Sequence, residues 1–193
     1  MGYYQHNKTT VVTTETYKYV YMYKKQLLQN VTTMLNKINV KFVISHGNLI
    51  EFARNKPIYH DDDLDIRFDI NDMPKWQRFC DANCNHLTKY NICFDNRFKY
   101  IDKQKYNGIQ CRLIKFHNID NITEYSKIDI HCDLIASVVG INKHKPIWPP
   151  CNINFDKRMI INYLGVNTFA PNHSDTHMIL SKQYGPHYII PLK

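Results

Sequence analysis

Four carboxylates crowd into five positions about a third of the way along the chain: Asp61, Asp62, Asp63 and Asp65. From Leu64 to Phe68 apolar and polar side chains alternate, which predicts a strand whose side chains point to opposite faces in turn. Asp63 and Asp65 then project from one face. Carboxylates this close repel one another unless a cation offsets their charge, and oxygen ligands suit Mg2+ or Mn2+. The run therefore predicts a magnesium or manganese site, although by itself it also fits a solvated turn.

A glycine upstream of the acidic run supports this prediction. Gly47 and the polar Asn48 follow the apolar run Phe42-Val43-Ile44, and residues 49–55 are predicted to form a helix. Backbone N–H groups at such a turn and at the start of a helix can bind an anionic phosphate. One glycine alone, however, indicates only a turn. A strand, a glycine turn, a helix and an aspartate-bearing strand are similar in outline to the nucleotidyltransferase sheet of the polymerase-beta type.

Residues 46–69 resemble the hallmark motif of the LicD family of phosphocholine and phosphoalditol transferases, to which fukutin and fukutin-related protein are similar. The positions in register with that motif are Gly47, Leu49, Arg54, Ile58 and residues 61–66. Asn48 stands where the family has threonine, and Glu51 replaces its second glycine. Residues 128–133 look like a later strand of the family, and residues 163–166, 170–172 and 183–188 look like its closing pattern. The resemblance spans about residues 25–191.

The resemblance implies a metal-dependent transferase that uses a CDP-linked alcohol, such as CDP-choline or CDP-ribitol, and a sugar hydroxyl of a glycan. The residues it marks as catalytic and metal-binding are Asp63, Asp65 and Asp129. The metal would bridge the diphosphate of the donor, and Asp129 would help to deprotonate the acceptor hydroxyl. The residues expected to bind substrate are Gly47, Asn48, Arg54, Asp61 and Asp62.

Two other functions stay open. One is a nucleotidyltransferase of the same fold that uses an NTP and acts on a sugar phosphate, a small molecule or RNA. The other is an inactive nucleotide-binding or glycan-binding module of the same fold, which the departures at Asn48 and Glu51 keep in view.

The length and charge indicate one basic domain. A chain of 193 residues suits a flexible arm over residues 1–14 and a single domain over residues 15–193. The net charge of +8 favours a polyanionic partner such as a nucleotide. Nucleic acid is a weaker expectation, because the basic residues are scattered and form no stripe.

Cysteine usage and hydropathy indicate the cytoplasm. No apolar signal segment precedes the six cysteines, so buried thiols are expected rather than disulfides. Cys80, Cys84, His86 and Cys93 offer zinc ligands, but their spacing is not one of the common zinc patterns. No apolar run reaches the length of a membrane span.

Hydrophobic periodicity predicts an α+β (mixed α/β) fold, with a nucleotidyltransferase-like, twisted, mixed sheet and helices packed on it. One helix is predicted over residues 14–38. A second begins after an N-cap at Asp72, with Pro74 in its first turn, and a third covers residues 174–184 and is ended by Gly185. Further strands are predicted near residues 92–94, 98–101, 111–114 and 127–136, and a further segment around residues 159–161.

Overall fold

The computed structural model describes residues 14–56, 58, 61, 63–81, 92–94, 113–118, 132–137 and 153–189. Several predictions lie outside these residues and stay untested: the arm over residues 1–13, the strand at 98–101, the site residues Asp62 and Asp129, and the cluster members Cys84 and His86.

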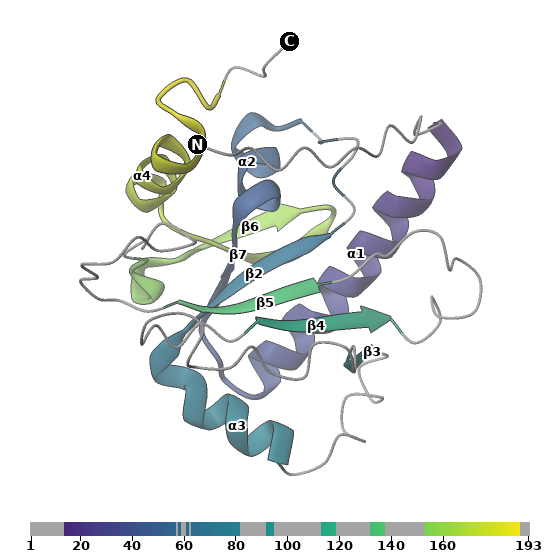
Figure 1. Ribbon diagram of the computed structural model, residues 1–193, viewed down its shortest axis with the longest axis vertical. Helices are drawn as coiled ribbons and strands as arrows, with labels where there is room; N and C mark the ends of the chain where they lie inside the picture. The colour runs from purple at the N-terminus through teal and green to yellow at the C-terminus, as the bar shows by residue number, and fades with distance from the viewer. Residues whose placement is uncertain are drawn as a thin grey trace.

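In the described part of the chain, helices and strands alternate as far as α3, and the strands β3 to β7 then precede the last helix (Figure 1). The helices are α1 (Thr14–Lys37), α2 (His46–Arg54), α3 (Met73–Asp81) and α4 (His173–Tyr184), with short 3-10 turns η1 (Ile70–Asp72) and η6 (Phe155–Lys157). The strands are β1 (Phe42–Ile44), β2 (Leu64–Asp69), β3 (Ile92–Phe94), β4 (Leu113–Asn118), β5 (Cys132–Ser137), β6 (Met159–Tyr163) and β7 (Val166–Ala170). None of the helices in these described residues has the length and apolar character that a membrane crossing requires.

The main sheet is mixed, which confirms that part of the prediction. Its strand order is β1-β2-β5-β4-β3, and β2 runs parallel to β5 while the other neighbours are antiparallel. In the parallel pair Asp65 is the register partner of Asp133. The polar start of β2 therefore lies beside the start of β5, the strand that follows Asp129 in the sequence.

A second, two-stranded sheet is formed by the antiparallel hairpin β6–β7. The sequence indicated a segment around residue 160 but not its partner strand β7, because Leu164 and Gly165 in the turn had been assigned to a motif. Both turn residues have positive φ, 54° and 74°, and glycine adopts this conformation at no steric cost. The ring of Phe169 on β7 meets that of Phe42 on β1 edge-on at 5.4 Å between centroids, so the hairpin packs against the edge of the main sheet.

Helix α1 supplies much of the core. Its fully buried positions recur at helical spacing and are Leu27, Leu28, Val31, Met34 and Leu35. The same helix carries Thr32, whose hydroxyl lies 3.2 Å from that of Thr168 on β7 in a buried hydrogen bond. α1 is thus joined to the hairpin by polar as well as apolar contacts.

Helix α2 begins at His46 and not at Leu49 as predicted. Gly47 therefore lies in the first turn of the helix, and its φ is not among the positive values. His46 instead takes a φ of 44°, which side chains with a Cβ adopt rarely and which periodicity cannot reveal. At the other end Asn55 has a φ of 48° and closes the helix with its N–H bonded to Phe52.

The predicted start of α3 is confirmed, because Asp72 directly precedes the helix and Pro74 lies in its first turn. The carboxylate of Asp72 accepts from the N–H of Lys41 at 2.7 Å and pairs with Lys75 at 2.6 Å. The strand predicted at residues 127–136 is described from Cys132 onward as β5, and residues 127–131 lie outside the described part of the chain. Cys132 is fully buried, as predicted for the cysteines. The end of α4 is confirmed, because Gly185 has a φ of 87° and its N–H bonds to the carbonyl of Ser181.

Candidate functional site

Asn48 fastens the acidic segment to the first turn of α2. Its amide group donates to the carbonyl oxygen of Asp63 at 3.2 Å, and its Oδ1 accepts from the N–H of Asp65 at 2.5 Å. Asn48 is fully buried, so these bonds form away from water. The positions of both carboxylate-bearing residues are therefore fixed relative to the helix. The predicted contact of Asn48 with a substrate stays a prediction.

The alternation predicted for the strand is confirmed only at its start. Leu64 and Ile66 are completely buried, while Asp63 and Asp65 are half-buried. Farther along β2 the predicted alternation is wrong, because the polar Arg67 is also buried. Both aspartates keep some access to solvent, as side chains that bind a ligand or an ion require.

Lys24 brings a positive charge into the acidic cluster, which is formed by Asp61, Asp63 and Asp65. This lysine of α1 is only 3% exposed, and its ammonium group donates to the Asp61 carboxylate at 3.1 Å and to the Asp61 carbonyl at 3.0 Å. Burial and the nearby Asp63 nevertheless raise the pKa of Asp61 to about 6, against the effect of Lys24. One ammonium group therefore only partly offsets the crowding of the carboxylates.

Gly47 is needed because of a close approach and not because of a turn. A Cβ at this position would lie 2.8 Å from Oδ2 of Asp61, and that oxygen is already held by Lys24 and, at 3.4 Å, by Asn48. The carboxylate of Asp61 thus lies directly against the backbone of the first turn of α2. This packing does not test the predicted contact of Gly47 with a substrate, which stays a prediction.

Glu51 lies in the same helix but is fully engaged. Its Oε1 accepts from the N–H of Ile58 at 2.6 Å, and its Oε2 accepts from the hydroxyl of Tyr163. The ammonium group of Lys24 lies 3.7 Å from Oε2. Burial, and then the charge of Glu51, raise the pKa of Tyr163 far above its usual value, so this tyrosine keeps its proton and donates.

His46 approaches Asp65 from the side of Arg67. Burial and the Arg67 guanidinium lower the pKa of His46 to about 3, so the imidazole is neutral at pH 7. Arg67 can only donate, and it bonds to Nε2 of His46 at 3.1 Å, so the ring proton resides on Nδ1. That nitrogen lies 3.0 Å from the hydroxyl of Ser45 and 3.8 Å from the carboxylate of Asp65. The N–H of His46 therefore donates to the hydroxyl of Ser45, and the neutral ring brings no positive charge to Asp65.

The C-terminal helix closes the site on another side, where α4 lies next to α2 (Figure 1). Arg54, predicted to clamp a phosphate, donates from Nε to the carbonyl of Tyr188 at 2.6 Å and so links the two segments. Tyr184 is 46% exposed. Its partial burial and the charges of Asp65 and Asp61 raise its pKa to about 12, which places this tyrosine within the field of the acidic cluster.

The third predicted metal ligand, Asp129, lies outside the described residues. Among the residues that the structure describes, no three His, Cys, Asp or Glu side chains are grouped as a metal site would need. The metal site, with Asp63 and Asp65 as predicted ligands at the start of β2, stays a prediction.

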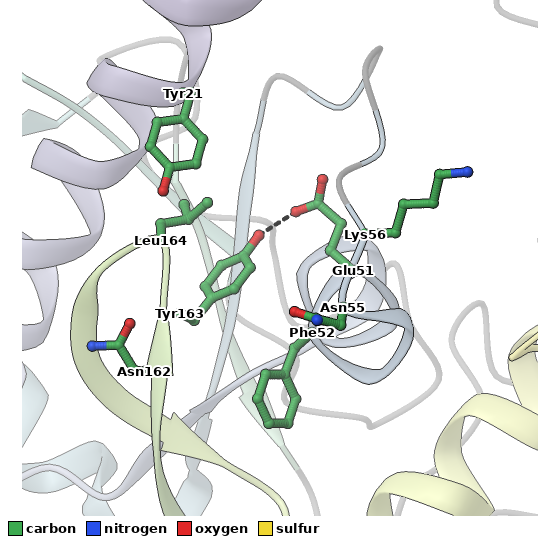
Figure 2. A pocket seen from close by; sticks show the side chains of 8 residues that line it. All are labelled: Tyr21, Glu51, Phe52, Asn55, Lys56, Asn162, Tyr163 and Leu164. Carbon is green, nitrogen blue, oxygen red and sulfur yellow. Dashed lines mark hydrogen bonds between the residues drawn. The ribbon is translucent and has the colours of Figure 1, made fainter.

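A pocket of about 380 Å3 opens beside the cluster (Figure 2). Its walls come from α1, the second half of α2 and the β6–β7 turn, and Glu51 and Tyr163 belong to both the pocket and the cluster. The sequence did not place Lys24 at the site, and it indicated Tyr163 only as part of the closing motif. A lysine in an amphipathic helix is normally placed on the solvent face, and Tyr163 is separated from Glu51 by 112 positions, so neither contact has a local signal.

Comparison with known proteins assigns no function to this site. The sequence matches no protein-family model, and no curated protein matches it. The functional argument therefore depends on the arrangement of Asp61, Asp63 and Asp65 around the first turn of α2, together with the motif resemblance.

Proposed function

We propose that this chain is a metal-dependent transferase with a nucleotidyltransferase-like fold. It moves a phosphocholine or phosphoalditol group from a CDP-linked donor to a sugar hydroxyl of a glycan. The observation that carries the proposal is the pair of hydrogen bonds from the side chain of Asn48 to the backbone of Asp63 and Asp65. It holds two carboxylates that face the same way beside the N-terminal turn of a helix, where an anionic phosphate is favoured.

The residues present fit Mg2+ or Mn2+. Asp63 and Asp65 offer oxygen ligands, which these ions prefer, and both side chains are half-buried and keep access to solvent. A bound divalent ion would neutralise charge on the diphosphate and on the departing CMP. Asp63 and Asp65 would hold that ion, and by resemblance Asp129, which precedes the neighbouring strand β5, would complete the ligand set.

The chain's own groups account for positioning and proton transfer. The first turn of α2 orients the donor phosphate, and Lys24 keeps Asp61 against that turn. The acceptor oxygen forms a bond to the phosphorus next to the alcohol, while the bond from phosphorus to CMP breaks. The hydroxyl proton passes to a carboxylate, a role assigned to Asp129 by resemblance.

The contacts of Glu51 favour activity over an inactive binding module. A free carboxylate beside the phosphate-binding turn would repel a donor. Both oxygens of Glu51 instead accept hydrogen bonds, and Lys24 lies close by. The substitution of the family's glycine is therefore compensated within this chain.

The test is to incubate the protein with CDP-choline, CDP-ribitol or CTP, with and without Mg2+, and to separate the nucleotides by chromatography. We expect CMP release from a CDP-alcohol only with Mg2+, and a loss of about 100-fold or more in Asp65→Asn, as when a charge-stabilising group is removed. Pyrophosphate release from CTP, with no CMP from either CDP-alcohol, would instead identify an NTP-using nucleotidyltransferase. No nucleotide product from any donor would overturn the proposal.

A further inference from the structure

We propose that the pocket between α1, the second half of α2 and the β6–β7 turn binds a sugar residue of the acceptor. This inference rests on the proposed function, because it assigns the acceptor to a place beside the donor site. The volume of about 380 Å3 lies within the range of about 300–1,000 Å3 that is usual for small-ligand sites.

Two charged residues line the pocket, Glu51 and Lys56, and the negative charge of Glu51 is balanced. The carboxylate of Glu51 on its wall is 6% exposed, accepts two hydrogen bonds and has the ammonium group of Lys24 at 3.7 Å. The wall therefore carries no unbalanced negative charge, and nothing on it requires a charged ligand.

The side chains that line the pocket offer what a sugar ring needs. Tyr21, Phe52 and Tyr163 present aromatic rings on which the C–H face of a sugar can pack, and Figure 2 shows them on separate walls. Asn162 donates to Asn167 at 3.2 Å, and its own Oδ1 is left to accept from a ligand hydroxyl. Asn55 adds a second amide group at the end of α2.

The pocket also lies at the right place for an acceptor. Lys24 contacts Glu51 on the pocket wall and Asp61 in the acidic cluster, at 3.7 Å and 3.1 Å, so one ammonium group separates the two. A sugar in the pocket therefore lies next to the carboxylates that we propose for the donor site. The Tyr163–Glu51 hydrogen bond, drawn in Figure 2, keeps this shared wall in place.

The chain offers two matched pairs of variants for a test. Tyr21→Ala removes a pocket ring that is 39% exposed, and Tyr19→Ala removes a ring that is 44% exposed on the same helix but does not line the pocket. Asn55→Gly removes a pocket amide at a φ of 48°, and Asn39→Gly makes the same change at a φ of 55° outside the pocket. Glycine tolerates both backbone conformations, so all four proteins should fold.

Binding of the methyl glycosides of glucose, galactose, N-acetylglucosamine and N-acetylgalactosamine would be measured by saturation-transfer NMR titration in EDTA, without nucleotide. We expect at least one glycoside to bind wild type, Tyr19→Ala and Asn39→Gly equally. It should bind Tyr21→Ala about three- to tenfold more weakly, as expected for the loss of one aromatic contact, and Asn55→Gly should also bind more weakly. No binding of any glycoside, or equal binding by all variants, would overturn the inference.

The two proposals fail separately in this design. Sugar binding that depends on Tyr21, with no CMP release from any CDP-alcohol, would retain the pocket assignment and reject the transferase. CMP release with no sugar bound in the pocket would retain the transferase and reject the pocket assignment.

Discussion

Lys24 is the residue on which the acidic cluster most depends for stability. It is buried and lies within 4 Å of two carboxylates, those of Asp61 and Glu51. In metal-free buffer at pH 7, Lys24→Met should lower the free energy of unfolding by about 3–5 kcal/mol, because it leaves buried charge without a partner. Urea unfolding measures this. Lys18→Met, at an exposed position of the same helix, should change stability by no more than about 0.5 kcal/mol, and an equal effect of both substitutions would contradict the account.

Gly47 should show a change of sign in a double-mutant cycle. Replacing a helical glycine by alanine normally stabilises, but here the new Cβ would lie 2.8 Å from Asp61. Gly47→Ala should therefore destabilise the wild type by about 1–3 kcal/mol, as overpacking does. In an Asp61→Ala background the same substitution should stabilise by about 0.5–1 kcal/mol. Denaturant midpoints give both numbers, and the same sign in both backgrounds would exclude the close approach.

Asp61 also makes stability depend on pH. Its folded pKa of about 6 is above the ordinary value of 3.8, so between these values the folded state binds more protons than the unfolded state. This group therefore adds stability as the pH falls from 7 through 6 toward 4. His46 acts in the opposite direction over an overlapping range, because its folded pKa of about 3 is below the ordinary 6.5. The measurement is thus the difference between wild type and Asp61→Asn in metal-free buffer, which should shift in favour of wild type as the pH falls. A constant difference would refute the assignment.

At the scale of elements, the buried pair Thr32 and Thr168 joins α1 to the β6–β7 hairpin. Either Thr32→Val or Thr168→Val leaves one buried hydroxyl without its partner, which should cost about 1–3 kcal/mol. The double variant removes both hydroxyls and should cost clearly less than the sum of the two singles. Thermal or urea unfolding of the four proteins completes the cycle, and strict additivity would mean that the bond contributes nothing.

The same scale shows what the sequence could predict. α1 and β2 were predicted because their apolar residues recur at the period of a helix or a strand, β1 because it is a short apolar run, and α4 from Gly185, which ends it. The start of α2 was wrong by one turn because it depends on a positive φ at His46, a backbone property with no periodic signal. The site carboxylates were found from their crowding. Lys24 and Tyr163 were not placed at the site because their contacts join distant parts of the chain, and only the folded arrangement of α1, α2 and β6 brings them together.

For the whole molecule, the basic net charge and the acidic cluster act together. The chain carries +8, which attracts a polyanionic donor from a distance, while the carboxylates of Asp61, Asp63 and Asp65 require a cation before that donor can bind near them. We therefore expect the affinity for a CDP-alcohol to fall as salt is raised and to vanish in EDTA. Calorimetry over a range of salt concentrations checks this, and an affinity insensitive to both would contradict it.

The most direct measurement is a Mn2+ binding titration in the presence of CDP. The electron paramagnetic resonance signal of the free ion reports how much Mn2+ is bound. The account predicts that the wild type and Asp156→Asn, an exposed carboxylate on η6, bind Mn2+ equally. Asp63→Asn and Asp65→Asn should bind it at least about tenfold more weakly, a loss that even outer partners of a metal site can cause. Equal binding by all four proteins, or no binding by the wild type, would contradict the claim that these two aspartates hold a divalent cation.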